Sequence, residues 1–273
     1  MIKKILFPVD SSEACAAMAP YVLRAAELFS AQVSLLHVCH PESNNGFELY
    51  VRPLQEIAEE HIRIAQESLD SMLSSELPAD LYPRLLRCGD AAEQILEEAR
   101  SGEYDLILMP THAGRLRRML LGSTTARVLS DAECPVLTVQ YDHITAPRAV
   151  QNPTWICALS LSEDSQRVLR AASRAAVQGH AELFIVHVAG EDDSDTVGAE
   201  ELRRLDELVE AVGCKATVHI TRGAVKDAIL ASAANSAADV IITGRTAASH
   251  ALARMPHLLF ELVRDSPIPV LSV

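Results

Sequence analysis

Aromatic residues are scarce in this sequence: Phe, Trp and Tyr make up 4% of the 273 residues, although hydrophobic residues as a whole reach 49%. A core of Ala, Leu, Ile and Val is therefore expected, which suits helices packed on a sheet. No apolar run approaches the ~20 residues that a helix needs to cross a bilayer. Pro8 and Asp10 interrupt the first apolar stretch too early for a signal peptide. We expect a cytoplasmic protein with no membrane partner.

Basic residues are also few. Lys and Arg number 24 against 37 Asp and Glu, which gives a formal net charge of −13. Binding to nucleic acid depends on clustered Lys and Arg that displace counterions from the phosphates. The charge balance therefore argues against a nucleic-acid partner.

The cysteines form no CxxC pair, and in a cytoplasmic chain they are expected to be reduced and mostly buried. They are Cys15, Cys39, Cys88, Cys134, Cys157 and Cys214. The one local group typical of a metal site is His37, Cys39 and His40. On a strand, His37 and Cys39 share a face while His40 points the other way. We expect no metal site there.

Three common signatures are absent: G-x4-G-K-[ST], G-x-G-x2-G after a strand, and G-x-S-x-G. Their absence argues against a P-loop enzyme, a dinucleotide-binding domain and a serine hydrolase of the nucleophile-elbow type.

The most informative feature is an internal repeat. Residues 5–13 and 35–38 recur at 155–163 and 185–188, with an offset of 150. Residues 104–108 and 134–139 recur at 238–242 and 268–273, with an offset of 134. Two similar domains are expected at residues 1–141 and 153–273, joined by a Pro-containing linker. Corresponding positions can therefore be compared within one chain.

Apolar runs and helical spacing alternate along each half. Strands are expected at 2–9, 32–38, 81–87, 106–109 and 135–139, and near 154–159, 182–188, 215–221, 239–243 and 268–273. Helices are expected up to residue 30, with a kink at Pro20, over 54–77, from 89–90 and over 124–130. The pattern predicts an α/β fold of two tandem doubly wound domains, each a five-stranded parallel sheet flanked by helices.

Ligands of doubly wound sheets bind beyond the carboxyl ends of the strands, where a helix N-terminus presents free N–H groups. Three first-half segments are expected to meet there. They contribute the candidate residues Pro8, Val9, Asp10, Met109, Thr111, His112, Gly114, Gly122, Ser123, Thr124 and Thr125. The hydroxyls after Gly122 can donate to phosphate oxygens, and Asp10 can accept from an adenine amino group or a ribose hydroxyl. Two alternatives stay open: helix capping by Gly122 and Ser123, and solvated loop charges rather than phosphate clamps at Arg115, Arg117 and Arg118.

These segments carry a resemblance. The opening ILFPVDSSEA, the Gly89-Asp90 turn, MPTHAGRLRRMLLGSTTARVL and the ending AECPVLTV resemble the universal stress protein family, a branch of the adenine-nucleotide alpha-hydrolase-like group. The resemblance implies an adenine or ribose contact at Asp10 and a residue beside adenine at Val38. It also implies phosphate and ribose contacts at Gly114, Gly122, Ser123 and Thr124.

The first-half loop departs from the pattern of ATP-binding family members, G-x2-G-x9-G-S/T. Pro110 stands at the first glycine, and only eight residues separate Ala113, or seven separate Gly114, from Gly122. The second half departs further. Its offsets place Ser160 at Asp10, Pro256 at Gly122 and His257 at Ser123, and keep a glycine, Gly244, at Pro110. Proline lacks the backbone donor, so we expect no ATP binding there in the family manner.

The closing PVLTV and PVLSV segments resemble those through which family domains dimerise, so the two halves are expected to pair as an internal pseudo-dimer. Whether two chains form a homodimer stays open. The leading expectation is a stress-response protein that holds ATP or another adenine nucleotide, with or without Mg²⁺, in its first half. The alternatives are a slow ATPase, for which His112 is the local base candidate, and an interaction protein with both sites empty.

Overall fold

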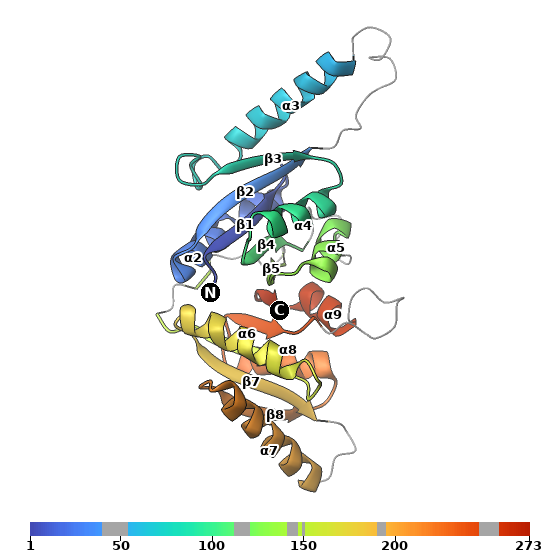
Figure 1. The fold of residues 1–273 in the computed structure, drawn as a ribbon. Coiled ribbons are helices and arrows are strands. Elements are labelled where there is room, and N and C mark those ends of the chain that lie inside the picture. The colour runs from blue at the N-terminus through green and yellow to red at the C-terminus, as the bar shows by residue number, and fades with distance from the viewer. Residues whose placement is uncertain (40–53, 112–120, 141–146, 149–150, 190–194, 246–256) are drawn as a thin grey trace.

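The computed structural model describes residues 1–39, 54–111, 121–140, 147–148, 151–189, 195–245 and 257–273. The two halves lie end to end, the first at the top of Figure 1 and the second at the bottom, and both termini lie near their junction. Pro, Asn and Gly at 40–53 predict a loop, and the acidic residues at 191–194 predict a solvated surface; both segments fall outside the described residues.

A single ten-stranded sheet runs through both halves, in the order β3-β2-β1-β4-β5-β10-β9-β6-β7-β8. The first-half strands are β1 (Lys4–Val9), β2 (Gln32–Cys39), β3 (Arg84–Cys88), β4 (Leu106–Pro110) and β5 (Val136–Val139). The second-half strands are β6 (Thr154–Ala158), β7 (Glu182–Ala189), β8 (Thr217–Arg222), β9 (Val240–Thr243) and β10 (Val270–Ser272). Within each half all pairs are parallel, which confirms the predicted pair of five-stranded sheets.

The two sheets join through β5 and β10, which pair antiparallel with Leu137 opposite Leu271. Two buried hydroxyls cross this seam: Thr138 Oγ1 donates to the Val270 carbonyl at 3.3 Å, and Ser272 Oγ donates to the Val136 carbonyl at 3.3 Å. The expected internal pseudo-dimer is therefore confirmed, and it forms by extension of the sheet.

Helices cover both faces of the sheet. One buried cluster takes side chains from α2 (Ala19–Phe29), α3 (Leu54–Ser71), α6 (Ser165–Gln178) and α7 (Asp195–Val212). The other takes them from α4 (Ala91–Ser101), α5 (Ser123–Asp131), α8 (Val225–Asn235) and α9 (His257–Asp265). This two-faced covering explains why the strands are almost continuously apolar in sequence.

The helix expected up to residue 30 is divided rather than kinked. α1 (Glu13–Ala17) ends at Met18, and α2 starts at Ala19 with Pro20 in its first turn, where a missing N–H costs little. The helix expected over 54–77 ends at Ser71, and Leu73 adopts a positive φ of 52°. The expected strand 81–87 begins at Arg84.

The expectation that all cysteines are reduced is wrong for two of them. Cys39 and Cys88 form a disulfide, with their Cα atoms 4.6 Å apart. They are register partners at the ends of β2 and β3, so the parallel pairing brings together thiols that are 49 residues apart in sequence. Cys15, Cys134, Cys157 and Cys214 are free.

None of the helices in the described part of the chain is both long and apolar enough to span a membrane.

Candidate functional site

The end of β1 fixes the position of the Asp10 carboxylate. Asp10 is exposed, and its Oδ1 accepts hydrogen bonds from the backbone N–H of Ser12 at 3.0 Å and from the Ser12 hydroxyl. Ser12 in turn caps α1, because its Oγ accepts from the Cys15 N–H at 3.1 Å. Pro8 and Val9 lie within β1. The carboxylate is thus held at the carboxyl edge of the sheet.

The imidazole of His37, on β2, has a structural role. Its Nδ1 lies 3.0 Å from the Val9 carbonyl, and because a carbonyl only accepts, Nδ1 carries the proton and donates. The described residues contain no group of three His, Cys, Asp or Glu side chains that could hold a metal ion. His40, the other histidine of the sequence cluster, lies outside them.

The end of β4 is tied to the start of α5. The Gly122 N–H donates to the Thr111 carbonyl at 3.0 Å, and the Thr125 hydroxyl donates to the Pro110 carbonyl at 3.1 Å. Thr111 and Thr125 are buried, as is Met109 within β4. The Thr125 hydroxyl therefore donates its proton to the backbone of the site. A contact between Thr125 and a ligand stays a prediction.

Gly122 is the N-cap of α5, and as a glycine it provides no side-chain acceptor for the first-turn N–H groups. Ser123 is exposed and Thr124 half-buried on that first turn. Free N–H groups and the positive end of the helix dipole attract anions. The arrangement is therefore suited to a phosphate group.

Val38 lies next to this edge, on β2. It is half-buried and packs against the apolar cluster beneath α4 and α5. Five other candidates fall outside the described residues, and their roles stay predictions: His112, Gly114, Arg115, Arg117 and Arg118.

Two ion-paired residues beside the site were missed from the sequence. Asp90 caps α4 by accepting from the Glu93 N–H at 2.9 Å. Its carboxylate also binds Arg127 of α5, with Nη1 2.7 Å from Oδ1 and 2.8 Å from Oδ2. The Glu93 N–H and the Arg127 guanidinium hold the pKa of Asp90 below its usual value. The pair joins α4 to α5.

The sequence did not predict that a side chain of the second half donates hydrogen bonds to the first half. The Arg245 guanidinium reaches across the seam and donates to the carbonyls of Ala132 at 2.6 Å and Cys134 at 2.7 Å. Ala132 is the C-cap of α5, so a cation from the second half lies at the negative end of that helix. Burial lowers the pKa of Arg245. By the offset of 134, Arg245 corresponds to Thr111 of the first half. A comparison of these two positions in the sequence would have shown that a threonine is replaced by an arginine there.

The matching edge of the second half has different chemistry. Ser160 replaces the carboxylate of Asp10, and its hydroxyl donates to Ser162 Oγ at 3.0 Å. Ser165 Oγ accepts from the Ser162 N–H at 2.9 Å and donates to the Ser160 carbonyl. The three hydroxyls thus bond mainly to one another and to the backbone around them.

A cavity of about 260 Å³ nevertheless lies at this edge, lined by Ser160, His187, Thr243 and Gly244 among others. Pro256 and the His257 side chain, the second-half counterparts of Gly122 and Ser123, are not among the described parts of the chain. Gly244 has a packing role here, since a Cβ at this position would lie 2.6 Å from Val168 Cγ2. The second half therefore has a cavity at this edge but no carboxylate at the position that corresponds to Asp10.

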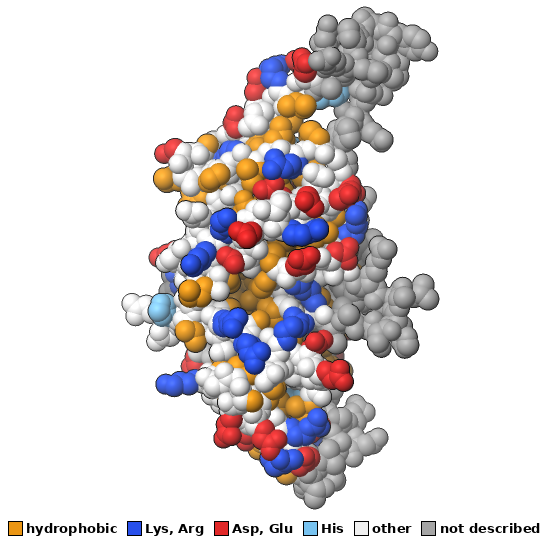
Figure 2. Space-filling model, in the orientation of Figure 1, with side chains coloured by type: hydrophobic (Ala, Val, Ile, Leu, Met, Phe, Trp, Pro, Cys, Tyr) orange, Lys and Arg blue, Asp and Glu red, His pale blue; other side chains and the backbone are white. Residues whose placement is uncertain are grey.

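A second cavity, of about 160 Å³, lies between the halves at the opposite edge of the sheet. Its walls include Phe29 and Trp155, whose rings meet edge to face with centroids 6.1 Å apart. Its floor includes Leu137 and Leu271 of the joining strands. On the face drawn in Figure 2, hydrophobic side chains gather across the middle of the molecule among Lys and Arg side chains.

Comparison with known proteins places this geometry in context. A family model described as Universal stress protein family matches residues 1–140 and 155–273. A universal stress protein of Methanocaldococcus jannaschii is 29% identical over 147 residues, which are 51% of this chain and 83% of that protein. Universal stress protein A homolog 2 of Coxiella burnetii is 30% identical over 124 residues, 44% of this chain and 84% of that protein. Each of these relatives aligns with about half of the chain.

One solved structure matches both halves together. The crystal structure of a universal stress protein from Archaeoglobus fulgidus covers 98% of this chain, and 97% of that protein is covered, with a TM-score of 0.72 and 24% identity. At this identity the likeness supports the fold, including the tandem arrangement of the two halves.

Proposed function

Because the chain belongs to the universal stress protein family, we propose that it is a cytoplasmic stress-response protein that binds an adenine nucleotide such as ATP in its first half. We assign the site to a first domain of residues 1–141 and a supporting role to a second domain of residues 153–273. The observation that carries the proposal is the N-terminus of α5, where a glycine N-cap offers the first-turn N–H groups no capping side chain.

The residues around that helix fit the parts of a nucleotide. The first turn of α5, with Gly122, Ser123 and Thr124, faces the phosphates. The Asp10 carboxylate, oriented by Ser12, accepts from the ribose or the adenine amino group. Val38 provides an apolar surface for the base. The carboxylate follows β1, the apolar Val38 lies near the end of β2, and the first turn of α5 comes after β4; these three strands are neighbours in the sheet.

The second half is proposed to support rather than to duplicate this site. It lacks a carboxylate at Ser160, and its hydroxyls bond to one another. Its Arg245 holds the C-terminal end of α5 in place. We therefore propose that one nucleotide binds per chain. A universal stress protein has been solved in complex with cAMP; that is a property of that protein, and the proposal for this chain rests on its own first half.

The test is a titration of the purified chain with ATP, followed by thermal unfolding and by calorimetry. Ligand at 100 times its Kd should stabilise the folded state by about 2.7 kcal/mol. Gly122→Pro, which copies the residue of the second half, removes the N–H that donates to the Thr111 carbonyl and so loosens the N-terminus of α5 from the end of β4. It should weaken ATP binding by at least about tenfold. Its unfolding temperature without ATP shows whether the variant is still folded.

Ser160→Ala is the matched control, because it alters the second-half edge and should leave the ATP affinity unchanged. No shift in unfolding temperature at millimolar ATP would refute the nucleotide proposal. Binding of two nucleotides per chain would refute the asymmetry. Recovery of the bound nucleotide after incubation separates a binder, which returns intact ATP, from an ATPase, which returns ADP.

A further inference from the structure

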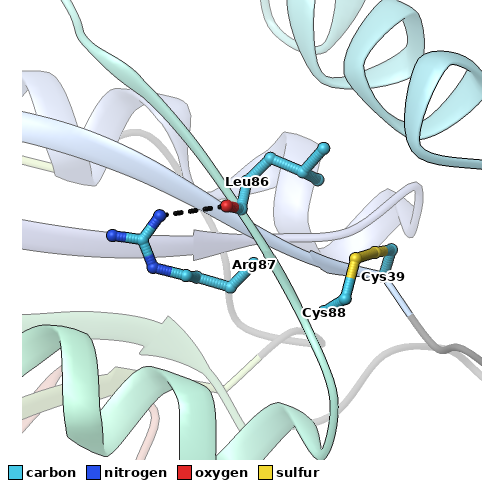
Figure 3. Close-up of a disulfide and its surroundings, with 4 residues drawn as sticks. All are labelled: Cys39, Leu86, Arg87 and Cys88. Carbon is cyan, nitrogen blue, oxygen red and sulfur yellow. Dashed lines mark hydrogen bonds between the residues drawn. A yellow bond between two sulfur atoms is a disulfide. The ribbon is translucent and has the colours of Figure 1, made fainter. Parts of the chain in front are cut away.

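Cys39 and Cys88 form a covalent bridge at the same edge of the sheet as the candidate nucleotide site. They are the last register partners of β2 and β3, and Figure 3 shows the bond between the two strand ends. The Gly89 N–H donates to the Cys39 carbonyl at 3.0 Å directly beyond the bridge. Cys88 is exposed and Cys39 half-buried, so the bridge lies at the protein surface.

The four free cysteines are in a different environment. Burial raises the pKa of Cys15 to about 12 and that of Cys157 to about 12. Burial also raises the pKa of Cys134 and of Cys214. Because the thiolate is the form that attacks a disulfide, these four thiols exchange slowly at neutral pH. Burial thus disfavours exchange at the four free thiols, whereas Cys88 of the bridge is exposed.

The bridge is connected to the candidate site on both sides. Val38, the proposed neighbour of the base, precedes Cys39. On the other side Cys88 leads through Gly89 to Asp90, which binds Arg127 of α5. Gly89 has a positive φ of 142°, so this short turn is conformationally specific. A bond between the two sulfur atoms therefore fixes Val38 relative to the Gly89-Asp90 turn, whose Asp90 binds α5.

The second half shows that the edge can form without a bridge. The matching register partners of β7 and β8 are Ala189 and Arg222. The following residue, Gly223, again has a positive φ, of 117°. The same strand ends and turn are therefore built from an alanine and an arginine. The bridge is not needed to shape this edge, so it is available for another role.

We propose that Cys39 and Cys88 are a reversible dithiol–disulfide site, oxidised by low-molecular-weight disulfides, whose oxidised form binds the nucleotide of the first half more tightly. The effect on the nucleotide rests on the proposed function; the cross-link itself does not. The Cys88 thiolate attacks a small disulfide RSSR, forms a Cys88–S–S–R mixed disulfide and releases one RS⁻. The Cys39 thiolate then attacks the Cys88 sulfur and releases the second RS⁻.

The net reaction converts two protein thiols and RSSR into one protein disulfide and two RSH. Tighter binding follows because the cross-link removes freedom that the edge would otherwise lose when the ligand binds. We expect oxidation to increase the ATP affinity by about three- to tenfold.

The cross-link is tested first, without nucleotide. The full chain is equilibrated in buffers with a graded ratio of oxidised to reduced glutathione, alkylated, and analysed by mass spectrometry. Cys39 and Cys88 should lose their alkylation together, and the chain should lose the mass of two hydrogens. Hydrogen exchange at the Gly89 amide should slow by about tenfold in the oxidised form.

Cys88→Ser should stop the cross-link and leave Cys39 as a mixed disulfide with glutathione. Cys134→Ser is the matched control. It should change neither the alkylation of Cys39 and Cys88 nor the hydrogen exchange of the Gly89 amide. The proposal is overturned if the two thiols stay fully alkylated in the most oxidising buffer. It is equally overturned if the bridge resists the most reducing buffer, because the site is then not reversible.

ATP affinity is measured next in the oxidised and reduced forms. The expected difference should vanish in Cys88→Ser. Equal affinities in the two forms would overturn the regulatory claim while nucleotide binding stands. Absence of ATP binding in both forms, with normal cross-linking, would instead remove the proposed function and with it the effect on affinity.

Discussion

His37 and His187 make the same hydrogen bond at the same place in the two halves, to the carbonyls of Val9 at 3.0 Å and of Leu159 at 2.8 Å. α5 and α9 are also equivalent, at Ser123–Asp131 and His257–Asp265, an offset of 134 throughout. Positions that tie one strand to the next are thus retained in both halves.

The residues that follow the strands differ instead. The second half has Ser160 for Asp10, Gly244 for Pro110 and Arg245 for Thr111. The scaffold tolerates these changes because the edge residues contribute little to the buried clusters that hold the sheet. The comparison teaches that one fold can keep its sheet while the residues that follow its strands change from Asp10 to Ser160 and from Thr111 to Arg245.

The largest expected effect comes from Arg245, whose position in the first half is occupied by Thr111. Arg245→Met removes two donors at 2.6 and 2.7 Å and leaves the carbonyls of Ala132 and Cys134 without them. We expect the free energy of unfolding, measured in urea by circular dichroism, to fall by about 2–4 kcal/mol.

Arg148→Met is the control for Arg245. It also loses a bond to a carbonyl, that of Ala237 at 2.9 Å, but its side chain is 60% exposed. Its cost should stay below about 1 kcal/mol. If both variants lose the same free energy of unfolding, the bonds across the seam stabilise the protein no more than an exposed hydrogen bond does.

Gly244 tests whether the second-half glycine serves packing. A Cβ there meets Val168 Cγ2 at 2.6 Å, so Gly244→Ala should lower the free energy of unfolding by about 1–3 kcal/mol. Val168→Ala removes the clash, and the double variant should therefore be more stable than the sum of the single losses predicts, by at least about 0.5 kcal/mol. Strict additivity would mean that α6 moves aside without cost.

Asp10 and Ser160 test the difference in binding chemistry. Asp10→Ser gives the first half the second-half residue and should weaken ATP binding by about tenfold, since a bond to a charged acceptor is worth about 1.5–3 kcal/mol. Ser160→Asp, the reverse change, should add no second nucleotide, because a carboxylate alone does not restore the helix N-terminus. Calorimetric stoichiometry and affinity decide both outcomes.

Much of this could be predicted from the sequence. The repeat and the alternating apolar runs predicted both sheets, because buried strands are local patterns. The pairing of the sheets was implied by the resemblance of the PVLTV and PVLSV endings to the segments through which family domains dimerise. The break at Met18 and the early end of α3 at Ser71 could not, because they depend on tertiary packing. The Cys39–Cys88 bridge was missed because strand register, not spacing, brings the sulfur atoms together. Roles at residues 112–118 stay predictions.

The smallest expected effect concerns the ends of α5 and α9. Asp265 binds Arg264 and Lys226, whereas the same offset gives Asp131 the neighbours Ser130 and Ala92. The two cations lower the pKa of Asp265 to about 2. A lowered carboxyl pKa stabilises the fold above the unfolded-state value of ~3.9, and the gain is lost as the pH falls toward 2.

Asp265→Asn should therefore destabilise the chain at pH 7 by at most about 1 kcal/mol, since these are partly exposed ion pairs screened by solvent. The difference from the wild type should vanish near pH 2. Asp131→Asn, the first-half control, should show a smaller loss at pH 7. Urea unfolding at the two pH values measures both. A loss for Asp265→Asn that persists unchanged at the lower pH would mean that packing, rather than charge, gives this aspartate its weight.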